Sequence, residues 1–188
     1  MMLEPIVLVV RLVLNIFAFL FLMRFVLQAV HADFYNPISS AIVRFTNPVL
    51  RVVRQVLPTF RNLDLASFGA TLIAYTLADL TRIVSRGEIT PIDWWKLIRF
   101  ELYQTLDLLV SIFLFAIFIL IALSWLVQFG IIHGSRSPAT TLLNQICEPV
   151  LRPAKKLLPP VGMIDLSPMI TIVIIWIIQR WLLPGLLL

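Results

Sequence analysis

Four ionisable side chains lie in stretches of the chain that are otherwise strongly apolar. They are Arg11, Asp79, Asp107 and Arg180. Asp79 and Arg180 are 101 residues apart, which is also the period of the repeat described below. Charges inside apolar segments are costly and often functional. We therefore predict a polar layer near the outer leaflet, in which Asp79 pairs with Arg180 or Arg11. Such a layer braces helices, the favoured interpretation, or lines a transport path.

The other residues that could do chemistry form no catalytic pattern. The sequence has no glycine-rich phosphate loop, no HExxH motif and no nucleophile elbow. Cys147 is the one cysteine, which excludes an intramolecular disulfide, and we place it on the polar side of an amphipathic helix. His31 and His133 are 102 residues apart, one residue out of register, which argues against a symmetric haem or metal pair. We predict no enzyme activity, no cofactor and no metal site.

A repeated motif organises the chain. Its two copies, 101 residues apart at every position, are Pro48-Val49-Leu50-Arg51, Leu57-Pro58 and Asp64-Leu65, then Pro149-Val150-Leu151-Arg152, Leu158-Pro159 and Asp165-Leu166. A period of this kind indicates two copies of one structural unit.

The motif predicts an in-plane helix followed by a turn, which redirects the chain at the membrane surface into the next span. Its first proline (Pro48, Pro149) should bend or split an in-plane helix, and its arginine (Arg51, Arg152) should face lipid head groups. Its second proline (Pro58, Pro159) should end that helix, and its aspartate (Asp64, Asp165) should cap the next span. We therefore interpret the motif as structural.

Composition places these elements in a membrane. Of 188 residues, 60% are hydrophobic and 13% are charged, whereas soluble domains are about 45–50% apolar and about a quarter charged. The net charge is +5, and the basic residues flank hydrophobic stretches. We therefore expect anionic lipid head groups, and no nucleic acid, as binding partners, with a membrane-protein partner or a homo-oligomer as the further alternatives.

We predict an all-α membrane protein with two units joined by an interfacial segment at 87–104. The first unit, 1–86, holds spans at 6–30 and 65–84 and an interfacial helix at 38–57. The second unit, 105–188, holds spans at 108–128 and 167–183 and an interfacial helix at 140–158. The interfacial helices are amphipathic and too charged to span, so they should lie in the membrane plane. A cleaved signal peptide is the rival reading of 6–30, but its apolar run is too long and Glu4 replaces a positive residue.

Two smaller patterns concern helix packing. Alanines recur every four residues at Ala66, Ala70, Ala74 and Ala78, a small-residue stripe that allows another helix to approach closely. Arg24 lies near the end of the first span, where its long side chain should snorkel to lipid phosphates.

Two spans in each unit make the repeats parallel, related by a pseudo-two-fold axis along the membrane normal. The two motif loops each carry four basic residues and the middle loop carries three. The positive-inside rule then places the motif loops in the cytoplasm and both termini outside, for a multi-pass protein of the bacterial inner membrane.

The doubled motif resembles the YggT (also called YlmG) family of small bacterial and plastid membrane proteins. Asp33-Phe34-Tyr35-Asn36-Pro37 and Ser135-Arg136-Ser137-Pro138, which precede the two copies, resemble the family as well. The resemblance covers nearly the whole chain and implies the four-span, two-repeat layout. It also implies links to membrane-complex and cytochrome assembly, to cell division and to ion or osmotic tolerance, without one agreed molecular activity.

Three functions follow from these patterns. The first is a non-enzymatic membrane scaffold or assembly factor with a basic cytoplasmic docking face. The second is a small transport or osmotic-response component that uses Asp79 and Arg180. The third, haem or cytochrome maturation, requires haem to be bound in stoichiometric amount.

Overall fold

The computed structural model describes residues 4–57, 63–85, 92–131, 137–157 and 167–187. In these ranges the chain forms six α-helices and two short terminal turns of helix. The elements are α1 (Glu4–Ala29), α2 (Pro37–Val53), α3 (Leu65–Ser85), α4 (Trp94–Gln128), α5 (Pro138–Leu157), α6 (Ser167–Ile177), a π-helical turn (Ile178–Leu182) and a 3-10 turn (Leu183–Leu187). The predicted all-α class is confirmed.

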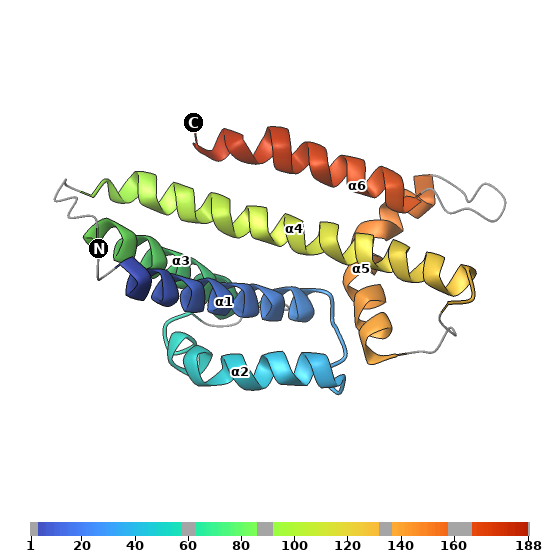
Figure 1. Ribbon diagram of the computed structural model, residues 1–188, viewed down its shortest axis with the longest axis horizontal. Coiled ribbons are helices and arrows are strands. Elements are labelled where there is room, and N and C mark those ends of the chain that lie inside the picture. The colour runs from blue at the N-terminus through green and yellow to red at the C-terminus, as the bar shows by residue number, and fades with distance from the viewer. Residues whose placement is uncertain (1–3, 58–62, 86–91, 132–136, 158–166, 188) are drawn as a thin grey trace.

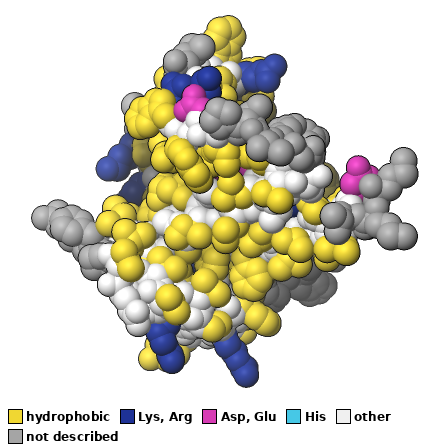
Figure 2. All heavy atoms as spheres, turned by 90° about the vertical axis from the view of Figure 1, so that its left-hand side faces the viewer, with side chains coloured by type: hydrophobic (Ala, Val, Ile, Leu, Met, Phe, Trp, Pro, Cys, Tyr) yellow, Lys and Arg dark blue, Asp and Glu magenta, His cyan; other side chains and the backbone are white. Residues whose placement is uncertain are grey.

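α1, α3, α4 and α6 run side by side along the long axis of the molecule (Figure 1). α1 packs on α3, α3 on α4, and α4 on α6. α2 runs back below α1 in this view, whereas α5 crosses the direction of α4. The start of α1, the end of α3, the start of α4 and the end of the chain all lie toward the left-hand end. Figure 2, which looks at that end, shows hydrophobic side chains over most of the visible surface and basic side chains at its upper and lower margins.

Among the described residues, three helical segments are long and apolar enough to cross a membrane: Glu4–Ala29, Trp94–Gln128 and Ser167–Gly185. They correspond to three of the four predicted spans, and the chain is a membrane protein. α3 has the predicted bounds but is less apolar, because Asp79 and Arg82 lie in its second half. Its crossing of the membrane, and with it the four-span layout, stays a prediction.

The alanine stripe on α3 is buried, as the sequence indicates. Ala66, Ala70, Ala74 and Ala78 are each at most 5% exposed. α1 and α3 have the most extensive contact of any two helices in the described chain. Small side chains allow this because they let two helix backbones approach closely.

α2 has three faces. Its buried face packs on α1 and α3 through Ser39, Ile42, Thr46 and Leu50. A second, exposed face carries the apolar residues Ile38, Phe45, Val49 and Val52. The third, also exposed, carries Arg44 and Arg51. We call the second face the apolar stripe of α2 and the third its basic edge.

The motif prolines do not split the helices. Pro48 lies inside α2, and Pro149 lies inside α5, which is also continuous. α2 ends at Val53, before the predicted end at 57, because the chain tightens there: Val53 O accepts from the N–H groups of both Val56 (3.1 Å) and Leu57 (2.9 Å). The predicted helix-ending Pro58 and Pro159, and the predicted cap Asp165, lie outside the described residues.

The connecting segment and the third span are one helix. α4 has 35 residues and is about 52 Å long, which exceeds the roughly 30 Å hydrocarbon core. Asp93 caps it, its carboxylate accepting from the N–H of Lys96 at 3.2 Å. The predicted boundary between the connecting segment and the second unit, at residue 104, therefore lies within α4.

Cys147 corrects a sequence prediction. Its side chain is fully buried in the core between α1, α4, α5 and α6, whereas the helix pattern placed it on the polar face. α5 is covered by α4 and α6 on the side that the pattern left to water.

We expect Cys147 to be nearly inert toward maleimide in the folded protein. Burial raises the pKa of its thiol to about 11, and only the thiolate reacts. The labelling rate near neutral pH should be about a hundredfold below that of the SDS-unfolded chain, which serves as the control. Mass spectrometry of timed samples measures both rates, and equal rates would contradict the buried position.

Candidate functional site

Three helices meet at a largely buried group of charges, which we call the junction cluster: Arg24 and Asp64, which are buried, and Arg54, which is partly exposed. Arg24 comes from α1, Arg54 follows the end of α2, and Asp64 immediately precedes α3. Asp64 Oδ2 is 2.7 Å from Arg54 Nη2 and 3.6 Å from Arg24 Nε. One carboxylate thus joins two guanidinium groups across the first unit.

Arg24 is turned inward. Its Nη1 donates to Val43 O (3.2 Å), Thr46 Oγ1 (2.8 Å) and Asn47 Oδ1 (2.8 Å), all in α2. The residue is 7% exposed. The prediction that Arg24 snorkels to lipid phosphates is therefore wrong, because α2 folds back against α1 and supplies acceptors within the protein.

Asp64 is fully buried and remains a carboxylate. Burial alone would raise its pKa, but hydrogen bonds from Arg54 and from Ser67 outweigh that effect and hold the pKa below its ordinary value. Ser67 Oγ donates to Oδ2 at 2.7 Å, and the N–H of Ser67 lies 3.4 Å from Oδ1, as in a helix cap. The same carboxylate therefore contacts the start of α3 and ties it to α1 and α2.

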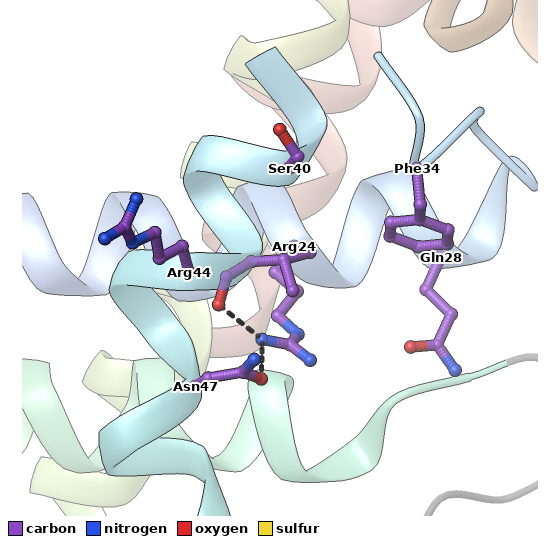
Figure 3. Close-up of a pocket in the computed structure, with 7 residues that line it drawn as sticks. Arg24, Gln28, Phe34, Ser40, Arg44 and Asn47 are labelled. Atoms are coloured by element: carbon purple, nitrogen blue, oxygen red, sulfur yellow. Dashed lines mark hydrogen bonds between the residues drawn. The ribbon is translucent and has the colours of Figure 1, made fainter. Parts of the chain in front are cut away.

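A cavity of about 390 Å³ with both polar and apolar lining residues lies beside the junction cluster (Figure 3). Its lining residues are Arg24, Gln28, Phe34, Ser40, Val43, Arg44 and Asn47. In the figure Arg24 and Asn47 occupy the centre, Arg44 lies to one side, and Gln28 and Phe34 lie to the other. The cavity is thus formed between the second half of α1 and the basic edge of α2.

A second group of charges, the distal cluster, lies toward the other end of the bundle and comprises Arg11, Asp79, Arg82 and Glu101. Asp79 Oδ1 is 3.8 Å from Arg11 Nη2 and 3.8 Å from Arg82 Nε. Glu101 of α4 is 1% exposed, and its carboxyl group lies beside that of Asp79. Its Oε1 has no hydrogen-bond partner among the described residues.

The predicted four-charge layer divides into separate contacts. Asp79 pairs with Arg11, one of the two predicted alternatives, and not with Arg180. Asp107 accepts from Gln179 Nε2 at 2.9 Å, which also donates to Ser111 Oγ at 2.9 Å. Arg180 is exposed and forms no ion pair within the described part of the chain. The π-helical turn holding Gln179 and Arg180 directs the amide, rather than the guanidinium, at α4.

The prolines and arginines of the motif that the structure describes lie at the surface, whereas Leu50 and Leu151 are buried. Pro48, Arg51, Pro149 and Arg152 are all exposed. None of them belongs to the junction cluster. In the described part of the first copy of the motif, Asp64 is the only motif residue that forms an ion pair within the junction cluster.

Comparison with known proteins shows to which family the chain belongs. The model of the CCB3/YggT family matches residues 3–84 and 100–186. The chain belongs to the CCB3/YggT family.

Relatives support the assignment over most of their length. An uncharacterized protein of Pseudomonas aeruginosa is 37% identical over 154 residues, covering 82% of this chain and 76% of the relative. The uncharacterized protein YggT of Escherichia coli strain K12 is 34% identical over 169 residues, covering 89% and 83%. An uncharacterized protein of Haemophilus influenzae is 29% identical over 171 residues, covering 91% and 87%. No solved structure matches the chain.

The sequence reasoning missed the roles of two residues of this CCB3/YggT chain, Arg54 and Glu101. Among the basic residues of the first motif loop the sequence did not single out Arg54, although it binds Asp64. Glu101 was assigned to an interfacial segment, yet it lies on the buried face of α4 with Thr105, Ile112 and Ala116. The spacing of these four residues, four, seven and four, is the signal that could have found Glu101.

Proposed function

We propose that this CCB3/YggT protein is a non-enzymatic scaffold or assembly factor of the bacterial inner membrane, with a basic docking face on the cytoplasmic side. In this proposal it has four spans, in two parallel units of span, interfacial helix and span, and both termini lie outside. The two separate matches to the family model support the division into two units.

The observation that carries the proposal is the arrangement of α2. Its buried face is fixed to α1 and α3, and the junction cluster at its end adds an ion pair at 2.7 Å. A helix fixed in this way still exposes an apolar stripe and, separately, the arginines of its basic edge. Lipid can cover the stripe while the arginines attract anionic head groups or an acidic partner protein.

The second unit supplies a comparable surface. Arg152 and Lys156 of α5 are exposed. The starts of α2 and α5 are joined, because Asn36, the N-cap of α2, donates to Pro138 O at 2.6 Å. This contact supports a docking face that extends over both units.

The proposal predicts that the double charge reversal Arg51→Glu with Arg152→Glu abolishes the binding of partner proteins and anionic lipids to the docking face. Cross-linking in native membranes, followed by purification and identification of bound proteins and lipids, measures it. The matched control is Lys96→Glu with Arg180→Glu, which reverses two exposed charges of α4 and of the π-helical turn. Loss of the same partners in both double variants, or in neither, would rule out a docking face at α2 and α5.

One observation favours the second candidate, a transport or osmotic-response component. Glu101 places a buried carboxyl oxygen without a partner next to Asp79. Carboxyl groups inside membrane proteins are common in ion and proton paths. Solute flux in liposomes that is lost in both Asp79→Asn and Glu101→Gln would support this candidate. No observation among the described residues favours haem maturation.

A further inference from the structure

The cavity beside the junction cluster has an excess of positive charge. Arg24, Arg44 and Arg54 contribute three positive charges at or next to it, and Asp64 contributes one negative charge, which leaves two in excess. None of the residues that line the cavity is acidic. Arg24 is buried and Arg54 is partly buried, so together with Asp64 they leave one positive charge in excess inside the protein, and the exposed Arg44 adds a second at the surface. Buried positive charge is costly unless an anion offsets it.

Donor groups are available at the cavity. The hydrogen bonds of Arg24 use Nη1, and Nε faces Asp64, so no described group accepts from Nη2. Asn47 accepts through Oδ1, which leaves its amide nitrogen free to donate. Arg44 lines the cavity and forms no ion pair with any described residue, and in Figure 3 its side chain extends to the side away from Arg24. Two guanidinium groups and an amide nitrogen make a set suited to an oxyanion.

The unit fold does not require these residues. At an offset of 101, the second unit has Trp125 in place of Arg24, Gln145 in place of Arg44 and Glu148 in place of Asn47. The motif arginine and aspartate are kept at the same offset. The cavity residues are therefore a property of the first unit alone.

We propose that this cavity binds a phosphate group, held by Arg24 and Arg44 with Asn47, Gln28 and Ser40 as polar neighbours. Its volume falls in the range of small-molecule sites, about 300–1,000 Å³. Phe34, which lines the cavity, and its neighbour Tyr35 are exposed aromatic residues of the kind found at a membrane interface. The phosphate can come from an anionic lipid head group or from a free phosphate. This inference deepens the proposed docking function and rests on it only for the lipid source.

The test compares two arginines of the same basic edge. Arg44 lines the cavity and Arg51, about two turns further along α2, does not. Arg44→Gln and Arg51→Gln remove the same charge from exposed positions. Binding to the purified protein in neutral detergent is titrated with dihexanoyl phosphatidic acid, with inorganic phosphate and with dihexanoyl phosphatidylcholine.

We expect Arg44→Gln to weaken binding of the phosphate probe about tenfold, because one charge-assisted hydrogen bond is lost. Arg51→Gln should leave it within about twofold, since a distant exposed charge is screened. Preference for phosphatidic acid over inorganic phosphate identifies a lipid site, and equal affinity identifies a free-phosphate site. Equal effects of both variants, no effect of Arg44→Gln, or equal binding of phosphatidylcholine would overturn the proposal.

The outcome is separable from that of the docking face. A protein with Arg51→Glu and Arg152→Glu that keeps its partners but binds phosphate through Arg44 would reject docking and retain the site. If partner binding depends on Arg51 and Arg152 but Arg44→Gln changes the affinity for no probe, the docking face is retained and the phosphate site is rejected.

Discussion

Replacing Asp64 with asparagine should lower the free energy of unfolding by about 3–5 kcal/mol. The carboxylate is fully buried, and Arg24 beside it is 7% exposed. Asparagine keeps the shape and the cap at Ser67 but leaves two guanidinium groups without a counter-charge. Unfolding by SDS titration in mixed micelles measures the loss.

Asp93→Asn is the matched control. Asp93 also caps a helix through the N–H of the third residue, but its side chain is half exposed, with one ion pair to Lys96 at 3.3 Å. Because asparagine caps as well as aspartate, this variant should unfold like the wild type. Adding Arg54→Gln to Asp64→Asn should restore part of the lost stability, since it removes one unpaired charge. Equal stability of Asp64→Asn and Asp93→Asn would refute the role of the junction cluster.

The carboxylate of Asp64 should also make the free energy of unfolding depend on pH in the acid range. Because the folded pKa of Asp64 is lowered, its stabilisation is complete above the unfolded pKa of about 3.9 and is lost as the pH falls through the folded value. Between about pH 5 and about pH 3 the wild type should therefore lose stability more steeply than Asp64→Asn. Parallel curves for the two proteins would contradict the lowered pKa.

Ala70→Leu should lower the free energy of unfolding by about 1–3 kcal/mol, although it adds apolar surface. Ala70 is 3% exposed in the interface between α1 and α3 and packs with Phe21 and Leu50. Three more carbon atoms there must displace α1 from α3 or force strained side chains. SDS titration again measures the effect.

Ala122→Leu makes the same substitution at an exposed position of α4. It should leave unfolding unchanged, because the added carbons face outward and displace no helix. A loss of the same size at both positions would mean that leucine itself, and not close packing of α1 on α3, is the cause.

Much of the architecture follows from local patterns. Apolar runs and turn residues predict the helices, and the stripe from Ala66 to Ala78 predicts the close packing of α3. These features depend on side chains near in sequence, so periodicity reveals them. The helix end at Val53 was not predicted, and of the two outcomes predicted for Pro48, a bend or a split, the split does not occur.

The charged sites depended on contacts between distant segments. Arg24, Arg54 and Asp64 are up to 40 residues apart, and no local pattern says which base a buried acid will bind. Symmetry suggested Arg180 for Asp79, but the packing of α1 on α3 brought Arg11 to it instead. A sequence repeat shows which positions of the two units are equivalent. It does not show which helices pack against each other.

The sequence by itself determined that this chain is an all-helical membrane protein with a doubled motif, because composition and period are properties of the chain. Only the tertiary structure decided that Arg24 and Asp64 are buried together and that Cys147 is covered. The physical reason is desolvation: an arginine near the end of a span can reach water or turn inward. It turns inward here because α2 and the start of α3 supply enough acceptors to offset the cost of burial.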